Sequence, residues 1–217
     1  RHYNLGNFYF NRGELKKAIR CYETALRLRP DTVPALVNAA LAYARLGDNK
    51  RAEKHLRNAL RADPTNAVAN FNMGLLLAEK GDREGAEKCL RRALRTDPRF
   101  PEAAYNLAVI LSEKDPEEAI RWCRKAVQLN PKEPKYLYSL AFYLQREGYL
   151  AEAEAALQNL IKEHSGYADA YALLGAIYEM QGETDRAYEV YRSALESPKI
   201  GKSAKLRFLA LLRALRS

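Results

Sequence analysis

The chain repeats itself with a period of 34 residues, and this period constrains its fold more than any local pattern does. Asparagine recurs at that spacing, at Asn4, Asn38, Asn72 and Asn106. In the same register, alanine forms a column at Ala18, Ala52, Ala86, Ala119, Ala153 and Ala187. Glycine forms another column at Gly13, Gly47, Gly81, Gly148 and Gly182. The alignment gives six units.

Each unit has the pattern of two helices joined by a short turn, because apolar residues recur at helical spacing on both sides of the turn. Glycine at the turn supplies the left-handed conformation that ends the first helix, and the aspartate of Gly47-Asp48 can cap the second. The fourth unit is one residue shorter and lacks this glycine. Asp115-Pro116 offers an N-cap and a proline at the first helical position instead, so we expect the turn to be kept.

The first unit resembles the tetratricopeptide-repeat family, and the resemblance rests on Tyr3, Asn4, Leu5, Gly6, Asn7, Tyr9, Gly13, Ala18, Tyr22, Ala25 and Pro30. It extends over about residues 1–198. The resemblance implies an all-α fold, a right-handed α-solenoid of six helix-turn-helix units. The expected units are 1–32, 33–66, 67–100, 101–133, 134–167 and 168–198.

One column of small residues marks where the two helices of a unit would cross most closely: Gly6, Ala40, Gly74, Ala108, Ala141 and Gly175. A larger side chain there is expected to cause strain of about 1 to 3 kcal/mol. The residues that precede this column are expected to fill the seam between helices: Leu5, Met73, Leu107, Leu140 and Leu174. No unit can bury its apolar face alone, so stacking of units predicts a curved superhelix with one concave face.

Residues 199–217 are expected to form a basic amphipathic helix that caps the last unit. Phe208, Leu211, Leu212 and Leu215 recur at helical spacing, and the segment carries six basic and no acidic residues. Terminal repeats need a cover of this kind. Because the apolar face is wide, a homodimer contact, a docking site for a further domain and a membrane-surface helix are the alternatives.

Composition is that of a folded chain, with 47% apolar and 29% charged residues. No apolar run approaches the roughly 20 residues that a transmembrane helix needs. We expect no signal peptide, and because the sequence begins at Arg1, inside a repeat, we expect it to be a piece of a longer protein. We expect a soluble chain whose compartment is open, with the cytoplasm slightly favoured.

No arrangement of residues predicts catalysis, a cofactor or a metal site. The histidines fall at unrelated places in their units: His2, His55 and His164. The cysteines lie far apart and are expected to be small, partly buried side chains: Cys21, Cys89 and Cys123. The carboxylates of Glu152 and Glu154 are expected on a solvated helix face. We therefore expect a protein that is not an enzyme and takes no small-molecule substrate.

Function is then expected on a surface, and the concave face of the first helices is the candidate. In this family two adjacent positions of each unit point into that groove, and they read Tyr3-Asn4, Val37-Asn38, Phe71-Asn72, Tyr105-Asn106, Tyr138-Ser139 and Ala172-Leu173. An asparagine amide can pair with both the N–H and the C=O of an extended backbone. Aromatic neighbours add apolar contact area.

This arrangement is similar to the asparagine ladder of O-linked N-acetylglucosamine transferases, whose groove holds extended polypeptide. The predicted peptide-binding residues are Asn4, Asn38, Asn72, Asn106, Tyr3, Phe71, Tyr105 and Tyr138. The expected partner is a protein or peptide. The alternative is that the ladder is inherited scaffold, with its amides hydrogen-bonded inside the chain. A clamp for two carboxylates is disfavoured, because Tyr3, Val68 and Asn72 occupy the positions that would have to be basic.

Two further readings stay open. The chain could be a structural or targeting appendage of a larger enzyme, such as a glycosyltransferase or a multihaem cytochrome. Nucleic-acid binding is less favoured, although residues 1–98 carry a net charge of +8, against −5 for 99–198 and +6 for 199–217. The positive charge of the first block lies largely on second helices, which are expected to be convex or edge-facing, whereas the groove has few cations.

Overall fold

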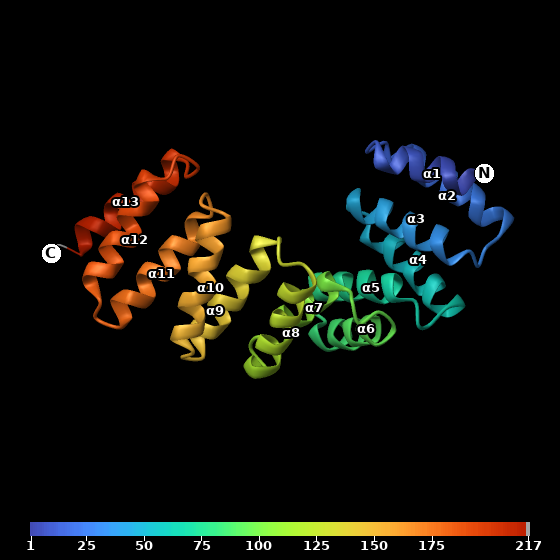
Figure 1. Ribbon diagram of the computed structural model, residues 1–217. Helices are drawn as coiled ribbons and strands as arrows, with labels where there is room; N and C mark the ends of the chain where they lie inside the picture. The colour runs from blue at the N-terminus through green and yellow to red at the C-terminus, as the bar shows by residue number, and fades with distance from the viewer. Residues whose placement is uncertain (216–217) are drawn as a thin grey trace. The chain divides into compact units, whose positions relative to one another are not determined.

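The computed structural model describes residues 1–215 (Figure 1). Within this range there are thirteen helices and no strand, and the helices are α1 (His2–Asn11), α2 (Leu15–Leu28), α3 (Val33–Arg45), α4 (Asn49–Ala62), α5 (Ala67–Glu79), α6 (Arg83–Thr96), α7 (Pro101–Leu111), α8 (Pro116–Leu129), α9 (Pro134–Arg146), α10 (Leu150–Glu163), α11 (Ala168–Met180), α12 (Thr184–Glu196) and α13 (Lys202–Ala214). The all-α fold predicted from the repeat is confirmed.

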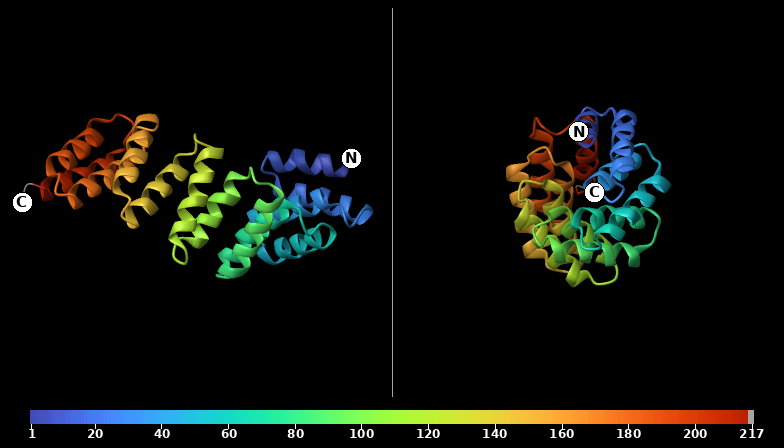
Figure 2. Two further views of the ribbon diagram at one scale, coloured as in Figure 1. Left: turned by 60° about the horizontal axis from the view of Figure 1, so that its bottom comes forward. Right: turned by 90° about the vertical axis from the view of Figure 1, so that its right-hand side faces the viewer.

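The chain forms two compact units, which we call unit 1 (residues 1–110) and unit 2 (residues 111–217, described to 215). In unit 1, α1 packs against α2, α3 against α4 and α5 against α6 (Figure 2). Contacts of α2 with α3 and of α4 with α5 join these pairs. In unit 2, α9 packs against α10 and α11 against α12, while α8, α10 and α12 each contact the helix that follows. Each pair is thus one helix-turn-helix repeat stacked on its neighbour.

The turns follow the chemistry expected from the sequence. Five glycines have positive φ angles, between +76° and +84°, and these are Gly13, Gly47, Gly81, Gly148 and Gly182. A Cβ there would meet nothing within 4 Å, so glycine is required by the backbone conformation rather than by space. In the fourth repeat the Asp115 carboxylate accepts a hydrogen bond from the Glu118 N–H at 2.9 Å, and the turn is kept without glycine.

The small-residue column is where the helices of a repeat cross. A Cβ on Gly6 would lie 2.4 Å from the Tyr22 ring, and one on Gly175 would lie 2.1 Å from the Tyr191 ring. At Gly74 the same atom would lie 3.0 Å from Leu90 Cγ. The alanine column is fully buried in all six repeats, at Ala18, Ala52, Ala86, Ala119, Ala153 and Ala187. Glycine therefore makes room for a large side chain of the second helix.

One residue of the predicted seam is not buried. Met73, Leu107, Leu140 and Leu174 are at most 6% exposed, but Leu5 is 43% exposed. The packing of α1 against α2 and α3 leaves the Leu5 side chain open, because no other helix of unit 1 covers that face. The expectation that Leu5 fills a seam is therefore wrong for the first repeat.

The basic C-terminal segment forms α13, which packs against α12. Phe208 is fully buried, with its ring centroid 6.1 Å from that of Tyr191 and 6.4 Å from that of Tyr171. Leu206 and Leu209 are exposed on the helix. Positions 216 and 217 of the expected 199–217 segment lie outside the described residues.

We predict that Gly74→Leu lowers the free energy of unfolding by about 1 to 3 kcal/mol more than Lys54→Leu does. The reason is that the added side chain meets Leu90 at the helix crossing. Lys54 is exposed on α4 and serves as the surface control. Urea denaturation of both variants measures the difference. Equal free energies of unfolding would contradict close crossing at this position.

Within α13 we predict that Phe208→Ala costs about 3 to 5 kcal/mol, because it removes a fully buried ring. Leu206→Ala on the same helix should change the free energy of unfolding by no more than about 0.5 kcal/mol, since Leu206 is 68% exposed. Equal effects of the two substitutions would show that α13 is not part of the folded unit.

Candidate functional site

The four asparagines of the predicted ladder lie in unit 1, one on each of the helices α1, α3, α5 and α7. The repeat places them at the same position of successive first helices. Helix α3 contacts both α1 and α5, so Asn38 lies on a helix between those of Asn4 and Asn72. Their side chains nevertheless have three different environments.

Asn38 belongs to a hydrogen-bond network inside the chain. Its Nδ2 donates to Asn7 Oδ1 at 2.9 Å and to the Tyr3 hydroxyl at 3.2 Å. The Tyr22 hydroxyl donates to the same Asn7 oxygen at 2.8 Å. Tyr22 is fully buried, and burial raises its pKa to about 12. Asn38 therefore joins α3 to α1 and α2, and its amide N–H groups are already used.

Asn72 and Asn106 instead turn back onto their own helices. The Nδ2 atoms donate to the carbonyl oxygens of Val68 and Glu102, both at 2.8 Å. A carbonyl oxygen can only accept, which fixes the amide nitrogen toward the helix. Each side chain is half-buried, and within the described residues its Oδ1 accepts no hydrogen bond. One acceptor and one N–H of each amide are thus left for an outside partner.

Asn4 is exposed on α1, and its side chain makes no hydrogen bond to residues 1–215. Asn38 differs from Asn72 and Asn106 because of the residue that it meets on the first helix of the preceding repeat. Asn38 meets Asn7 of the preceding repeat, whereas the residues that correspond to Asn7 in the next two repeats are Leu41 and Leu75, which cannot accept a hydrogen bond.

The four aromatic residues of the predicted site are all half-buried. Tyr3 takes part in the Asn38 network, and its ring centroid lies 6.1 Å from that of Tyr22. The Phe71 ring centroid lies 4.7 Å from that of Phe100. In unit 2, the Tyr138 and Tyr167 rings are 5.4 Å apart, and burial raises the pKa of Tyr138. Tyr105 lies beside Asn106 on α7 in unit 1 and also contacts other groups of the protein.

A small cavity of about 230 Å³ lies between α3 and α5, next to Asn72. Its lining residues are Ala40, Leu41, Ala44, Arg45, Asn49, Leu56, Asn72, Leu75, Leu76 and Glu79. Leu41 and Leu75 are not among the site residues predicted from the sequence. Each follows a ladder asparagine by three residues and therefore lies on the same helix face, and this spacing is the signal that could have identified them.

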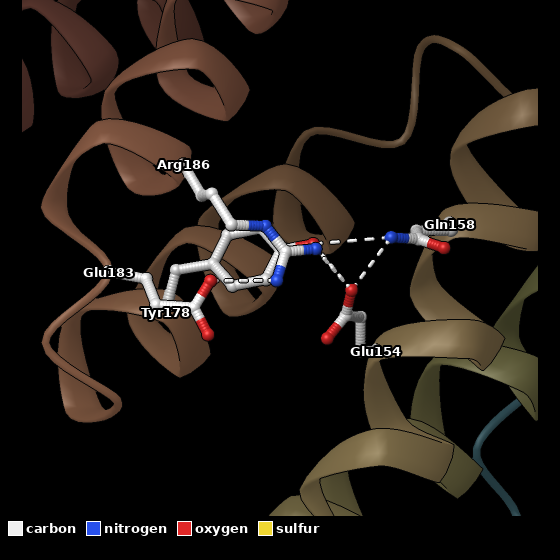
Figure 3. Close-up of polar contacts among 5 residues, drawn as sticks. All are labelled: Glu154, Gln158, Tyr178, Glu183 and Arg186. Carbon is white, nitrogen blue, oxygen red and sulfur yellow. Dashed lines mark hydrogen bonds and ion pairs between the residues drawn. The ribbon is translucent and has the colours of Figure 1, made fainter.

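Polar side chains also gather in unit 2, around Tyr178 of α11 (Figure 3). The Tyr178 hydroxyl donates to Glu154 Oε1 of α10 at 2.9 Å. Arg186 of α12 lies over the Tyr178 ring at 4.0 Å and donates to Glu154 at 2.5 Å and to Glu183 at 2.7 Å. Gln158 donates to Glu154 and to the Tyr178 hydroxyl.

This cluster joins three helices, and its positive and negative groups are paired with one another. Burial and the hydrogen bond to Glu154 raise the pKa of Tyr178. Glu154 is only 20% exposed and is therefore not the solvated carboxylate that the sequence suggested. The same positions in the second repeat hold Tyr43 and Arg51, and the Tyr43 hydroxyl donates to Glu23 at 3.1 Å. Because a tyrosine–carboxylate hydrogen bond joins neighbouring repeats at both places, these contacts are structural.

Three other properties bear on the kind of site. Among residues 1–215, no group of three or more histidine, cysteine or acidic side chains is placed to hold a metal ion. No helix in that range has the length and apolar character needed to cross a membrane. Cys89 and Cys123 are buried thiols, as expected, and burial raises the pKa of Cys123 to about 12. Cys21 is half-buried.

A protein-family model described as "Cilia and flagella-associated protein 70 C-terminal domain" matches residues 2–207. Among curated proteins, human Protein O-mannosyl-transferase TMTC1 is 32% identical over 80 residues, which are 37% of this chain and 9% of that protein. The chain thus spans a small part of the length of this relative.

Two solved structures share the fold. The structure of YrrB, described as a tetratricopeptide-repeat protein with an unusual peptide-binding site, has a TM-score of 0.75 at 22% identity and covers 87% of this chain and 97% of its own. The structure of PilF of Pseudomonas aeruginosa has a TM-score of 0.78 at 23% identity, and the match covers 97% of this chain and 96% of PilF. At these identities the likeness shows the fold alone, and it agrees with the tetratricopeptide resemblance of the sequence.

We predict that Asn38→Ala lowers the free energy of unfolding by about 1 to 3 kcal/mol, because it removes a donor from the part-buried Tyr3–Asn7–Tyr22 network. Asn72→Ala is the matched control and should change that free energy by no more than about 0.5 kcal/mol, since its amide bonds only its own helix. Chemical denaturation of the two variants measures both. Equal losses would contradict the division of the asparagines into structural and outward-facing ones.

Proposed function

Because the chain belongs to the tetratricopeptide family described as the C-terminal domain of cilia and flagella-associated protein 70, we propose that it binds a partner polypeptide in extended form along the first helices of unit 1. The observation that carries the proposal is that Asn72, which lines a mainly apolar cavity, has one Oδ1 acceptor and one N–H left for a partner. Asn106 offers the same two groups one repeat later.

The chemistry suits a polypeptide backbone better than a small molecule. One amide with a remaining acceptor and a remaining donor matches the N–H and C=O of a single residue in an extended strand. The cavity beside Asn72, at about 230 Å³, is smaller than the roughly 300 to 1,000 Å³ of ordinary ligand pockets and has room for one apolar side chain. Leu41 and Leu75 would contact that side chain.

Six of the eight predicted residues have a role in this proposal. Asn72 and Asn106 contact the partner backbone, with Asn4 as an outlying contact. Asn38 positions α3 against α1 and α2 and does not itself bind. The half-buried rings of Phe71 and Tyr105 flank the two amides on their own helices and add apolar contact. The peptide-binding site named in the description of YrrB supports the same use of a related fold.

A second candidate is that the chain is an appendage of a larger protein, and the similarity to a segment of human O-mannosyl-transferase TMTC1 favours it. The family description also supports a place in cilia or flagella for the parent protein. Both readings are compatible with peptide binding, because an appendage of this kind acts by holding a partner. Tagged full-length protein that is absent from isolated ciliary axonemes and from the ciliary membrane would contradict the ciliary assignment.

We predict that Asn72→Ala combined with Asn106→Ala weakens binding of a captured partner peptide by about 5- to 150-fold. Each hydrogen bond to the backbone contributes a net 0.5 to 1.5 kcal/mol in rough terms, and two are lost. Fluorescence titration of the labelled peptide measures the loss, with Asn58→Ala as a control for removal of an amide on a second helix. Equal affinity of the folded double variant and of the wild type would contradict the proposal.

A further inference from the structure

The second helices of unit 1 form a strongly basic surface that the proposed peptide site does not use. Helices α2, α4 and α6 carry 14 basic and 4 acidic residues, whereas α8, α10 and α12 carry 6 basic and 8 acidic residues. The repeat pattern does not require this difference, because the buried positions of all these helices are apolar apart from His55. The charge is therefore a property of this surface of unit 1 and not of the fold.

An open groove of about 420 Å³ lies on this surface between α4 and α6, and we call it the arginine groove. Its lining residues are Arg57, Leu60, Arg61, Met73, Leu77, Cys89 and Arg92. Met73 and Cys89 are buried, while Leu60 and Leu77 are half-buried and give the groove an apolar floor. The three arginines stand at its rim, and no aromatic side chain lines it.

The arginines of the rim are only partly neutralised. Arg57 pairs with Glu53 at 2.6 Å, but Glu53 is also paired with Lys80, so one carboxylate serves two cations. Arg61 donates to the neutral Asn58 side chain at 3.2 Å. Arg92 makes no ion pair within the described residues.

The positive surface continues beyond the groove. Arg92 also borders a depression of about 350 Å³ that holds Arg95, Thr65 and Thr96. Arg95 is exposed and has no acidic partner in the part of the chain that the structure describes. Arginine forks can hold carboxylates with two parallel hydrogen bonds, and such pairs strengthen where apolar surface excludes water.

We propose that the arginine groove binds an acidic polypeptide segment that places an apolar side chain on the Leu60–Leu77 floor and carboxylates against Arg61 and Arg92. Charge complementarity and the apolar floor both point to this partner. A single-stranded nucleic acid would share the charge, but it is held by aromatic rings that stack on bases, and the groove has none. The arginines of this site lie on the second helices α4 and α6, whereas Met73 and Leu77 come from α5, and none of its lining residues lines the cavity beside Asn72.

The probe is a fluorescein-labelled peptide built of Glu-Glu-Leu repeats, titrated against the whole chain by fluorescence anisotropy. We expect saturable binding that weakens between about 50 and about 200 mM salt, as ion pairs are screened. The same peptide with glutamine in place of glutamate, or with serine in place of leucine, should bind much more weakly. Equal binding of either control peptide would overturn the proposed chemistry.

The test variant is Arg61→Glu with Arg92→Glu, and it should lose at least about tenfold in affinity. The matched control is Lys132→Glu with Lys162→Glu, which makes the same change in net charge at exposed positions of unit 2 and should bind as the wild type does. Arg61→Gln with Arg92→Gln is the milder second variant and should also lose affinity. Circular dichroism and urea denaturation verify that each variant is folded.

Equal losses in the two glutamate variants would show that only overall charge matters, and the proposal would be wrong. Tighter binding of a single-stranded oligonucleotide with the same dependence on Arg61 and Arg92 would reassign the groove to nucleic acid. The Asn72→Ala, Asn106→Ala variant should bind the acidic peptide as the wild type does. A loss there would place the acidic peptide at the first-helix site and overturn the arginine groove.

Discussion

The close crossing of two helices at a small residue, glycine in three repeats and alanine in the other three, is the contact on which each repeat depends. Tyr22 occupies the space that a Cβ of Gly6 would need, and Tyr191 does the same at Gly175. Because a large ring is buried where glycine leaves room, the second helix is held at a fixed place against the first. That placement decides which faces of the helices remain outside, and both proposed sites lie on such faces.

Hydrogen bonds and ion pairs between neighbouring repeats, which we call polar ties, add to this apolar packing. The Tyr178–Glu154–Arg186 cluster has a counterpart at the corresponding Tyr43 in the second repeat, where the carboxylate comes from Glu23. Each tie links a tyrosine of one repeat to a carboxylate of the repeat before it. A part-buried carboxylate is costly to leave unpaired, so these ties favour one register between neighbouring repeats.

Unit 1 carries two surfaces of different chemistry. Its first helices present neutral amides beside a mainly apolar cavity, which suits an uncharged backbone. Its second helices α4 and α6 present arginines around an apolar floor to which α5 also contributes, and this arrangement suits carboxylates. A partner held at one surface would leave the other open, so the family's role as a binding module is compatible with two partners or with two segments of one partner.

The sequence by itself determined the all-α fold, the turns and the close crossings, because each depends on a residue type at a fixed place in a 34-residue period. It did not determine which asparagines face outward, since Asn38 and Asn72 occupy equivalent positions in that period. Only the packing of α3 against α1 brings Asn7 to Asn38, whereas Leu41 is the corresponding residue before Asn72. An amide bonds another amide but not a leucine, and the tertiary structure therefore decided which of two identical side chains is structural and which is left for a partner.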